Sequence, residues 1–206
     1  MTQPTIIHLI RHGEVHNPQQ VLYGRLPNFR LSDTGQRQAQ AAAQFMRDRA
    51  LAAIFSSPQQ RTQETAGFVA GHHPDLQVRV DPRLDEIHSP YQGNPLNQLA
   101  AMGWDLYTNI APEFEQPLDI LRRTQEFVNQ VRQDCAGSEV AAITHGDVIA
   151  FMFLFVKGVE PAAGKKVSFT SLGLPEIYPA TASVSTLTYF TDAPDEVPEY
   201  SYKRPY

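Results

Sequence analysis

The sequence contains a single cysteine, Cys135, among its 206 residues. One cysteine excludes a disulfide within the chain, and proteins without disulfides are typical of reducing compartments, so we expect a cytoplasmic protein. Cys135 follows a polar helical stretch with no basic neighbour to activate its thiol. It is therefore interpreted as a filler at a helix end and not as a nucleophile.

Long apolar runs are also missing, so we expect no membrane-spanning helix. The first 13 residues lack the basic segment and the apolar run of a secretory signal peptide. The chain has no basic surplus, because 17 lysines and arginines face 22 acidic residues for a net charge of -5. Nucleic acid is therefore not an expected partner, and an anionic ligand would need a local basic pocket.

The composition itself is ordinary for a globular protein, with 42% hydrophobic and 19% charged residues. The length suits one domain with one core, and no repeat or low-complexity segment divides the chain. We therefore predict a single domain over 1–206. Residues 87–117 are rich in Pro, Gly and Asn and are expected to form an excursion over one face. From about residue 191 the chain becomes Pro-rich and is expected to lie on the surface or to fray.

Short apolar and β-branched runs alternate with segments of helical spacing. Strands are predicted at 5–10, 53–56, 76–80 and 139–144, with further β-like segments at 166–170 and 183–190. Helices are predicted at 31–50, 58–70, 96–102, 118–135 and 147–157, with Ser32 and Ser57 as N-caps. This order predicts an α/β fold, a three-layer α/β/α sandwich whose sheet is mostly parallel, with partly antiparallel last strands.

Residues able to do chemistry stand just beyond these strands, where sheets of this type bind ligands. Polar or charged residues follow four expected strands in turn: Arg11 and His12, then Arg61, then Asp85 and Glu86, and finally His145 and Gly146. The carboxyl ends of parallel strands lie along one rim. We therefore expect these side chains to converge although they are far apart in the sequence.

The two arginines in this set suit a phosphate group. The planar guanidinium groups of Arg11 and Arg61 match phosphate oxygens, keep their charge and together neutralise a dianion. The predicted helix at 58–70 would add N–H groups and the positive end of its dipole. The charge of the phosphate is thereby balanced without a metal ion, so we expect no metal and no cofactor.

The histidines and acids supply the remaining roles in phosphoryl transfer. Neutral His12 has a lone pair able to attack phosphorus, and protonated His145 would stabilise the transferring group. The leaving alkoxide needs a proton, which Glu86 or Asp85 could supply, because a carboxyl beside a phosphate dianion has a raised pKa. The chemistry alone does not separate these two acids.

Residues 9–17 (LIRHGEVHN) resemble the signature of the histidine phosphatase superfamily, which includes the phosphoglycerate mutases. Further similar blocks follow in the expected order at 23–39 (YGRLPNFRLSDTGQRQA), 56–66 (SSPQQRTQETA), 83–87 (RLDEI) and 143–149 (ITHGDVI). The resemblance covers nearly the whole chain and implies a phosphoglycerate mutase-like fold. It implies a phosphohistidine at His12, a phosphate pocket of Arg11, Arg61 and His145 with Asn17 as a further contact, and Glu86 as the proton donor.

Two segments depart from the family pattern. Residues 88–94 (HSPYQGN) replace a run that in many relatives resembles Phe-Gly-x-Trp-Glu-Gly, and residues 179–185 (PATASVS) lack an asparagine often found there. Both border the substrate side, so the identity of the substrate is not defined. Arg25 is a further candidate for phosphate or substrate contact, and a solvated loop arginine is the equal alternative. Roles for His16, His88, Tyr91 and Trp104 stay open.

The expected function is a metal-independent phosphomonoesterase acting on a small phosphorylated metabolite. The alternative is a phosphoglycerate mutase, which returns the phosphoryl group to the substrate; those enzymes tend to be longer, so the compact chain favours a phosphatase. A metal site at His12, Glu14 and His16 is disfavoured because Arg11 and Arg61 would repel the cation. A non-catalytic phosphate-binding module is disfavoured because every catalytic role is filled. A monomer and a homodimer are both compatible with the sequence.

Overall fold

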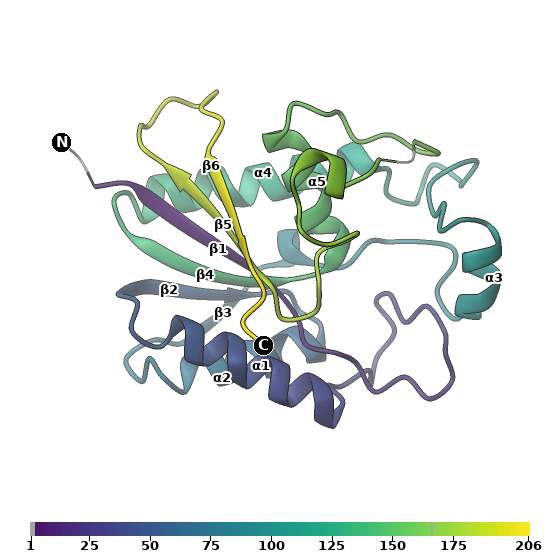
Figure 1. Cartoon of the computed structure of the whole chain (residues 1–206), viewed down its shortest axis with the longest axis horizontal. Coiled ribbons are helices and arrows are strands. Elements are labelled where there is room, and N and C mark those ends of the chain that lie inside the picture. The colour runs from purple at the N-terminus through teal and green to yellow at the C-terminus, as the bar shows by residue number, and fades with distance from the viewer. Residues whose placement is uncertain (1–2, 166) are drawn as a thin grey trace.

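The computed structural model describes residues 3–165 and 167–206. Its centre is a six-stranded sheet in the order β3-β2-β4-β1-β5-β6 (Figure 1). The strands are β1 (Thr5–Arg11), β2 (Leu51–Ser56), β3 (Val78–Val80), β4 (Glu139–Thr144), β5 (Val184–Tyr189) and β6 (Glu199–Lys203). The first four are parallel, β5 runs antiparallel to β1, and β6 runs antiparallel to β5. The predicted mostly parallel sheet with antiparallel last strands is confirmed.

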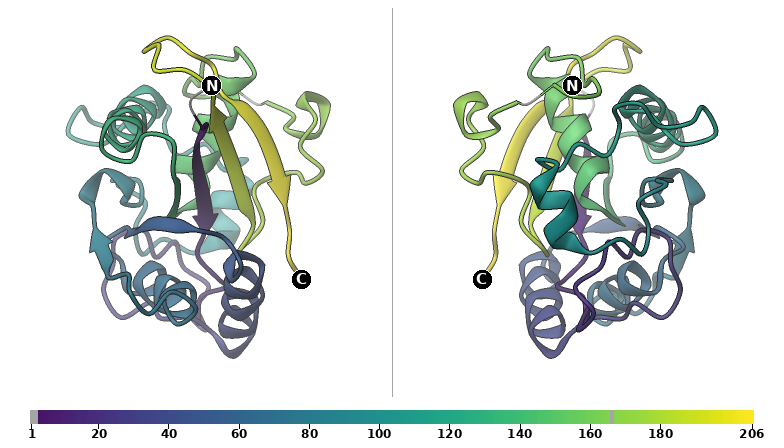
Figure 2. Two further views of the ribbon diagram at one scale, coloured as in Figure 1. Left: turned by 90° about the vertical axis from the view of Figure 1, so that its left-hand side faces the viewer. Right: turned by 90° about the vertical axis from the view of Figure 1, so that its right-hand side faces the viewer.

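Helices cover both faces of this sheet, which makes three layers (Figures 1 and 2). One face carries α1 (Asp33–Met46) and α2 (Gln60–Ala70), and the other carries α4 (Pro117–Asp134) and α5 (Gly146–Val156). The short helix α3 (Leu96–Ala101) lies in the excursion, away from the sheet. Two 3₁₀ turns, η1 (Pro82–Leu84) and η2 (Thr170–Leu172), complete the elements. The predicted α/β/α sandwich is thus observed.

The alternation of side chains along β1 explains why both faces need cover. Ile7 and Leu9 enter the core under α4 and α5, whereas Ile10 enters the core under α1 and α2. All three side chains are almost fully buried. A strand buried on both faces reads as a continuous apolar run, which is what residues 5–10 show.

Two helix boundaries differ from the sequence-based expectation. The first helix ends at Met46, short of residue 50, although Ser32 caps it as predicted by accepting a hydrogen bond from the Gly35 N–H at 3.0 Å. The second helix begins at Gln60, with Gln59 at its N-cap, so the prediction of a Ser57 cap and a start at Pro58 is wrong. The Ser57 hydroxyl is instead used in the site described below.

Two predictions near the C-terminus are also corrected. Lys166 lies outside the described residues, and the rest of the 166–170 segment forms a loop that leads into η2, not a strand. The tail from residue 191 does not fray throughout, because β6 pairs with β5 over five residues. Both sides of β5 are therefore occupied, by β1 and β6, so the outer strand at this end of the sheet is β6.

The excursion over residues 87–117 lies against the loop that follows β1. The Leu22 N–H donates to the Asn94 carbonyl at 2.8 Å, and the Gly93 N–H donates to the Leu22 carbonyl at the same distance. These two segments extend together beyond the carboxyl ends of the strands (Figure 1). Among residues 3–165 and 167–206, no helix is long and apolar enough to cross a membrane.

Candidate active site

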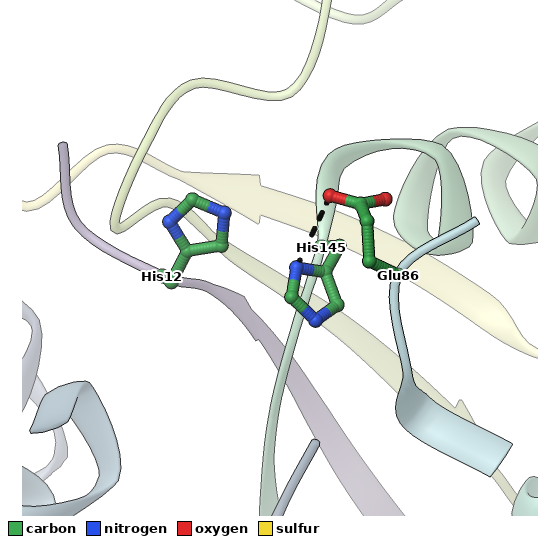
Figure 3. A group of neighbouring side chains, drawn as sticks. All are labelled: His12, Glu86 and His145. Atoms are coloured by element: carbon green, nitrogen blue, oxygen red, sulfur yellow. Dashed lines mark ion pairs between the residues drawn. The ribbon is translucent and has the colours of Figure 1, made fainter. Parts of the chain in front are cut away.

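His12 and His145 stand at the carboxyl ends of two neighbouring parallel strands. His12 follows β1, and His145 is the N-cap of α5 directly after β4. A hydrogen bond of 3.0 Å from the His12 N–H to the Thr144 carbonyl joins the two strand ends. The two imidazole rings are 5.2 Å apart between centroids, and Glu86 approaches from the loop after η1 (Figure 3).

Arg61, from the first turn of α2, connects these three side chains. Its Nε donates to His12 Nε2 at 3.3 Å. Its Nη2 lies 3.2 Å from His145 Nδ1 and 3.4 Å from Glu86 Oε2, and it donates to the Gly24 carbonyl at 2.8 Å. Arg61 is only 1% exposed. His12, Arg61, Glu86 and His145 therefore form one contiguous group, which we call the catalytic cluster.

The environment of His12 leaves one ring nitrogen available for attack. Nδ1 lies 2.7 Å from the Gly13 carbonyl, so it carries the proton and donates it there. The Nε2 lone pair then faces Arg61. Burial lowers the pKa of His12 well below its usual value of 6.5, and the charges nearby lower it further. His12 is therefore neutral at physiological pH, which is the form that a nucleophile requires.

Glu86 Oε2 lies 3.3 Å from His145 Nδ1, a buried contact that is an ion pair when His145 is protonated (Figure 3). Burial raises the pKa of the Glu86 carboxyl, but attraction to His145 and Arg61 outweighs burial and holds it far below its usual range. Burial lowers the pKa of His145, and Glu86 partly offsets that effect. With no phosphate bound, Glu86 is therefore ionised.

Ser57 is a contact that the sequence did not reveal. Its Oγ is 2.7 Å from His145 Nε2 and 3.3 Å from Asp85 Oδ1. The same Asp85 oxygen accepts hydrogen bonds from the Gln59 amide and the Glu86 N–H, both at 2.8 Å. Asp85 thus fixes the loop that carries Glu86 and, through Ser57, the ring of His145. Asp85 is thus engaged by three donors, whereas Glu86 is the carboxylate that contacts Arg61 and His145.

Arg11 reaches the site from the end of β1. Its Nη1 donates to the Pro179 carbonyl at 2.6 Å, and its guanidinium carbon lies 5.2 Å from the centroid of the Tyr178 ring. Its Nε is buried and has no hydrogen-bond partner within the described part of the chain. Arg49 Nε and Arg132 Nε share this condition, so the unpartnered donor does not by itself mark a binding position.

The other candidates take different places. Asn17 exchanges hydrogen bonds with the Val21 backbone, so its amide shapes the loop after β1. Arg25 donates to the Glu86 carbonyl and to Glu115, both at 2.7 Å, and its Nε lies 3.3 Å from Asp85, so its guanidinium is held by acidic and carbonyl groups of the protein. Gly146 is buried at the start of α5, with no room for a Cβ against Tyr178.

A hollow of about 480 Å³ opens beside the cluster. It is lined by Glu14, Val15, His16, Asn17, Gln20, Tyr23, Ser32 and Thr181. Tyr23 lines the hollow and also lies beside the cluster, with its ring 6.3 Å from that of His12 and 4.7 Å from the Arg61 guanidinium. No sequence pattern singled out Tyr23.

Three residues with open roles lie in the excursion. The ring of His88 packs on that of Phe114, with 5.0 Å between centroids, and Tyr91 packs against the core under α4 and α5. Trp104 is 52% exposed after α3. None of these observed contacts is with a residue of the catalytic cluster. His16, in contrast, lines the hollow.

The cluster also contains potential metal ligands. Single ligand atoms of His12, Glu86 and His145 lie within 4.8 Å of one another. The Arg61 guanidinium contacts all three of these residues, so a cation already occupies the position that a metal would take. The set at His12, Glu14 and His16 is not gathered, because the Glu14 carboxylate instead accepts a hydrogen bond from the Ser32 hydroxyl at 2.7 Å.

Comparison with known proteins agrees with this geometry. A protein of Mycobacterium tuberculosis is 38% identical over 165 residues, which cover 77% of this chain and 81% of that protein. A probable phosphoglycerate mutase of Yersinia enterocolitica is 26% identical over 181 residues, 83% of each chain. The solved structure of a mycobacterial glucosyl-3-phosphoglycerate phosphatase superposes with a TM-score of 0.75 at 24% identity and covers 98% of both chains, which shows a shared fold.

The family itself follows from a match over most of the chain. The model of the histidine phosphatase superfamily (branch 1) matches residues 7–193. That span contains the entire catalytic cluster and both strand ends that carry its histidines. The chain belongs to the histidine phosphatase superfamily.

Proposed function

We propose that the protein hydrolyses the phosphomonoester of a small metabolite through a phosphohistidine on His12. The observation that carries this proposal is the position of Arg61, whose buried guanidinium contacts the nucleophile, the second histidine and the acid together. A phosphate entering this cluster replaces protein acceptors of Arg61 with its own oxygens. It thereby lies directly against His12 Nε2.

The first step forms an N–P bond and breaks an O–P bond. The Nε2 lone pair of His12 attacks phosphorus, Arg11 and Arg61 hold the equatorial oxygens, and the departing alkoxide takes a proton from the Glu86 carboxyl. In the second step a water attacks phosphorus, returns one proton to Glu86, and releases inorganic phosphate and free His12. No metal or cofactor enters the proton and charge balance.

Glu86 gains its proton when the substrate binds. In the free site, Arg61 and His145 keep the Glu86 carboxyl ionised. A phosphate dianion engages both partners and adds negative charge close to the carboxyl, and each change raises the pKa of Glu86. Substrate binding and proton uptake are thus coupled, which prepares the acid only when a leaving group is present.

Hydrolysis is favoured over a mutase reaction by the charge of the excursion. Residues 87–117 contain no lysine or arginine, although a phosphoglycerate mutase must hold a carboxylate and a second phosphate near the first. The nearby cations Arg25 and Arg123 are both paired with Glu115. The similarity to a probable phosphoglycerate mutase of Yersinia enterocolitica keeps isomerisation as the second candidate.

The decisive assay measures phosphate release from a panel of phosphorylated metabolites after treatment with EDTA. We expect hydrolysis of at least one sugar, polyol or nucleoside monophosphate, with rates that neither EDTA nor added zinc changes by more than about twofold. Loss of activity in EDTA and its return with zinc would establish a metallohydrolase. Fast conversion of 3-phosphoglycerate in the presence of a trace of 2,3-bisphosphoglycerate, without free phosphate, would establish a mutase.

The pH dependence follows from the same groups. His12 must be neutral, and its lowered pKa keeps it neutral well below pH 6.5. Glu86 must be protonated in the complex, which acidic solution favours. We therefore expect kcat, measured at saturating monophosphate, to stay level or rise as the pH falls from about 8 to about 5.5. The ratio kcat/KM would also report protonation of the free ester, which takes up its second proton at pH ~6. A decline in kcat with a midpoint near the usual histidine value of 6.5 would show that His12 is not protected from protonation.

A further inference from the structure

We propose that Asp147 and Tyr178 form a positioning pair that holds the guanidinium of Arg11 in place for the phosphate. This inference rests on the proposed function, because it assigns Arg11 to phosphate binding. Neither residue of the pair belongs to the catalytic cluster. They come from different segments, Asp147 from the first turn of α5 and Tyr178 from the loop that leads into β5.

Asp147 is the anchor of the pair. One of its carboxylate oxygens accepts a hydrogen bond from the Tyr178 hydroxyl at 2.5 Å, and the other accepts from the hydroxyl of Tyr107. Both phenols stay protonated, because burial and the Asp147 charge raise the pKa of each tyrosine well above its usual value. Burial also raises the pKa of the Asp147 carboxyl, and the hydrogen bonds from Tyr107 and Tyr178 partly offset that effect. The Tyr178 ring is thus fixed at its hydroxyl end.

Tyr178 transmits this position to Arg11. The Arg11 guanidinium lies over the Tyr178 ring, and the next residue in the chain, Pro179, accepts a hydrogen bond from Arg11 Nη1. Consecutive residues of one loop therefore hold the guanidinium by a ring face and by a carbonyl. The Arg11 Nε is buried and takes no part in these contacts within the described part of the chain.

Gly146 makes room for this arrangement. A Cβ on Gly146 would overlap the Tyr178 hydroxyl and ring, so the ring packs directly on the helix start between His145 and Asp147. The ring could not reach both Asp147 and Arg11 if a side chain stood at position 146. A glycine at position 146 is therefore needed for the Tyr178 ring to pack against the start of α5.

The experiment compares three variants by calorimetric titration with inorganic phosphate and by steady-state kinetics on a monophosphate. Tyr178→Leu removes both the ring platform and the hydroxyl, and we expect the Kd for phosphate and the KM to rise about tenfold, with a smaller change in kcat. Tyr178→Phe keeps the platform and loses only the anchor, so we expect an increase of about threefold. Asp147→Asn keeps one acceptor oxygen and removes the charge, so the hydrogen bond to one of the two tyrosines is lost. We expect an effect no larger than that of Tyr178→Phe.

Tyr107→Phe is the matched control. It removes an equivalent hydrogen bond from the same carboxylate, but Tyr107 packs on Phe151 and does not touch Arg11. A role for the pair in positioning Arg11 requires that Tyr178→Phe weakens phosphate binding more than Tyr107→Phe does. Equal effects of the two variants on the Kd, with equal loss of thermal stability, would show that the hydrogen bonds to Asp147 are only structural, and would overturn the proposal.

Two further outcomes separate this inference from the proposed function. If the wild-type protein hydrolyses monophosphates and Tyr178→Leu binds phosphate as tightly as the wild type does, the positioning pair is refuted and the phosphatase stands. If the wild-type protein neither binds phosphate nor hydrolyses any ester of the panel, the proposed function fails, and the inference fails with it. Tyr178→Phe decides the question if the leucine variant does not fold.

Discussion

Replacing His12 with alanine is expected to reduce phosphatase activity by about four orders of magnitude or more, as removal of a covalent nucleophile does in other enzymes. The variant keeps Arg11, Arg61 and His145, so it should still bind phosphate. What it loses is Nε2 of His12, the atom that we propose forms the N–P bond. Initial rates of phosphate release, measured for the wild type and the variant on the same ester, give the ratio.

The control for this variant is His72→Ala, because His72 is an exposed histidine outside the cluster. Its rate should equal that of the wild type. Covalent chemistry is tested directly by rapid quenching with labelled substrate, which should trap an acid-labile phosphoenzyme in the wild type and none in His12→Ala. A His12→Ala protein that retains even a tenth of the activity would remove His12 from the mechanism.

Arg61→Ala is expected to cost about a thousandfold in kcat/KM, since it removes donors from the transferring phosphoryl group in a water-excluded site. The change also leaves the Gly24 carbonyl without its side-chain donor and removes the cation beside Glu86. Loss of one partner from a buried charged network costs about 3 kcal/mol, so urea denaturation should show a less stable protein.

Arg61→Lys separates charge from geometry. A lysine keeps the positive charge but cannot donate to His12, His145 and Glu86 from one planar group, so we expect a loss of about a hundredfold in kcat/KM. Arg37→Ala, at an exposed arginine of α1, controls for the loss of a positive charge in general. Activity of Arg61→Lys close to that of the wild type would mean that a point charge is sufficient and that the bridging contacts are incidental.

The convergence of the site could be predicted because it depends on few assumptions. Once residues 5–10 and 139–144 are assigned as buried parallel strands, His12 and His145 must lie on one rim. Their 5.2 Å separation also requires that β1 and β4 are neighbours in the sheet, which the sequence did not predict. The burial of these strands on both faces could also be predicted, because it is visible as a continuous apolar run within each strand.

Features that depend on distant partners could not be predicted. A serine before a proline is a typical N-cap, yet the Ser57 hydroxyl hydrogen-bonds to His145. Sequence spacing does not show whether such a hydroxyl bonds to the helix backbone or to a distant side chain. Residues 166–170 have strand-like composition, but the positions beside β5 are taken by β1 and β6. Likewise, no pattern in the sequence connects Asp147 with Tyr178, because a loop of unpredictable path joins them.

The order of strands in the sheet has a consequence for biosynthesis. Strand β1 is made first, yet it lies between β4 and β5, where Ile6 pairs with Glu139 on one side and with Thr188 on the other. On the ribosome, this apolar segment must wait for β4, at residues 139–144, and then for β5, at residues 184–189. Such non-local pairing is slow and leaves apolar surface exposed in the meantime. We therefore expect truncated translation products to aggregate and the nascent chain to bind chaperones.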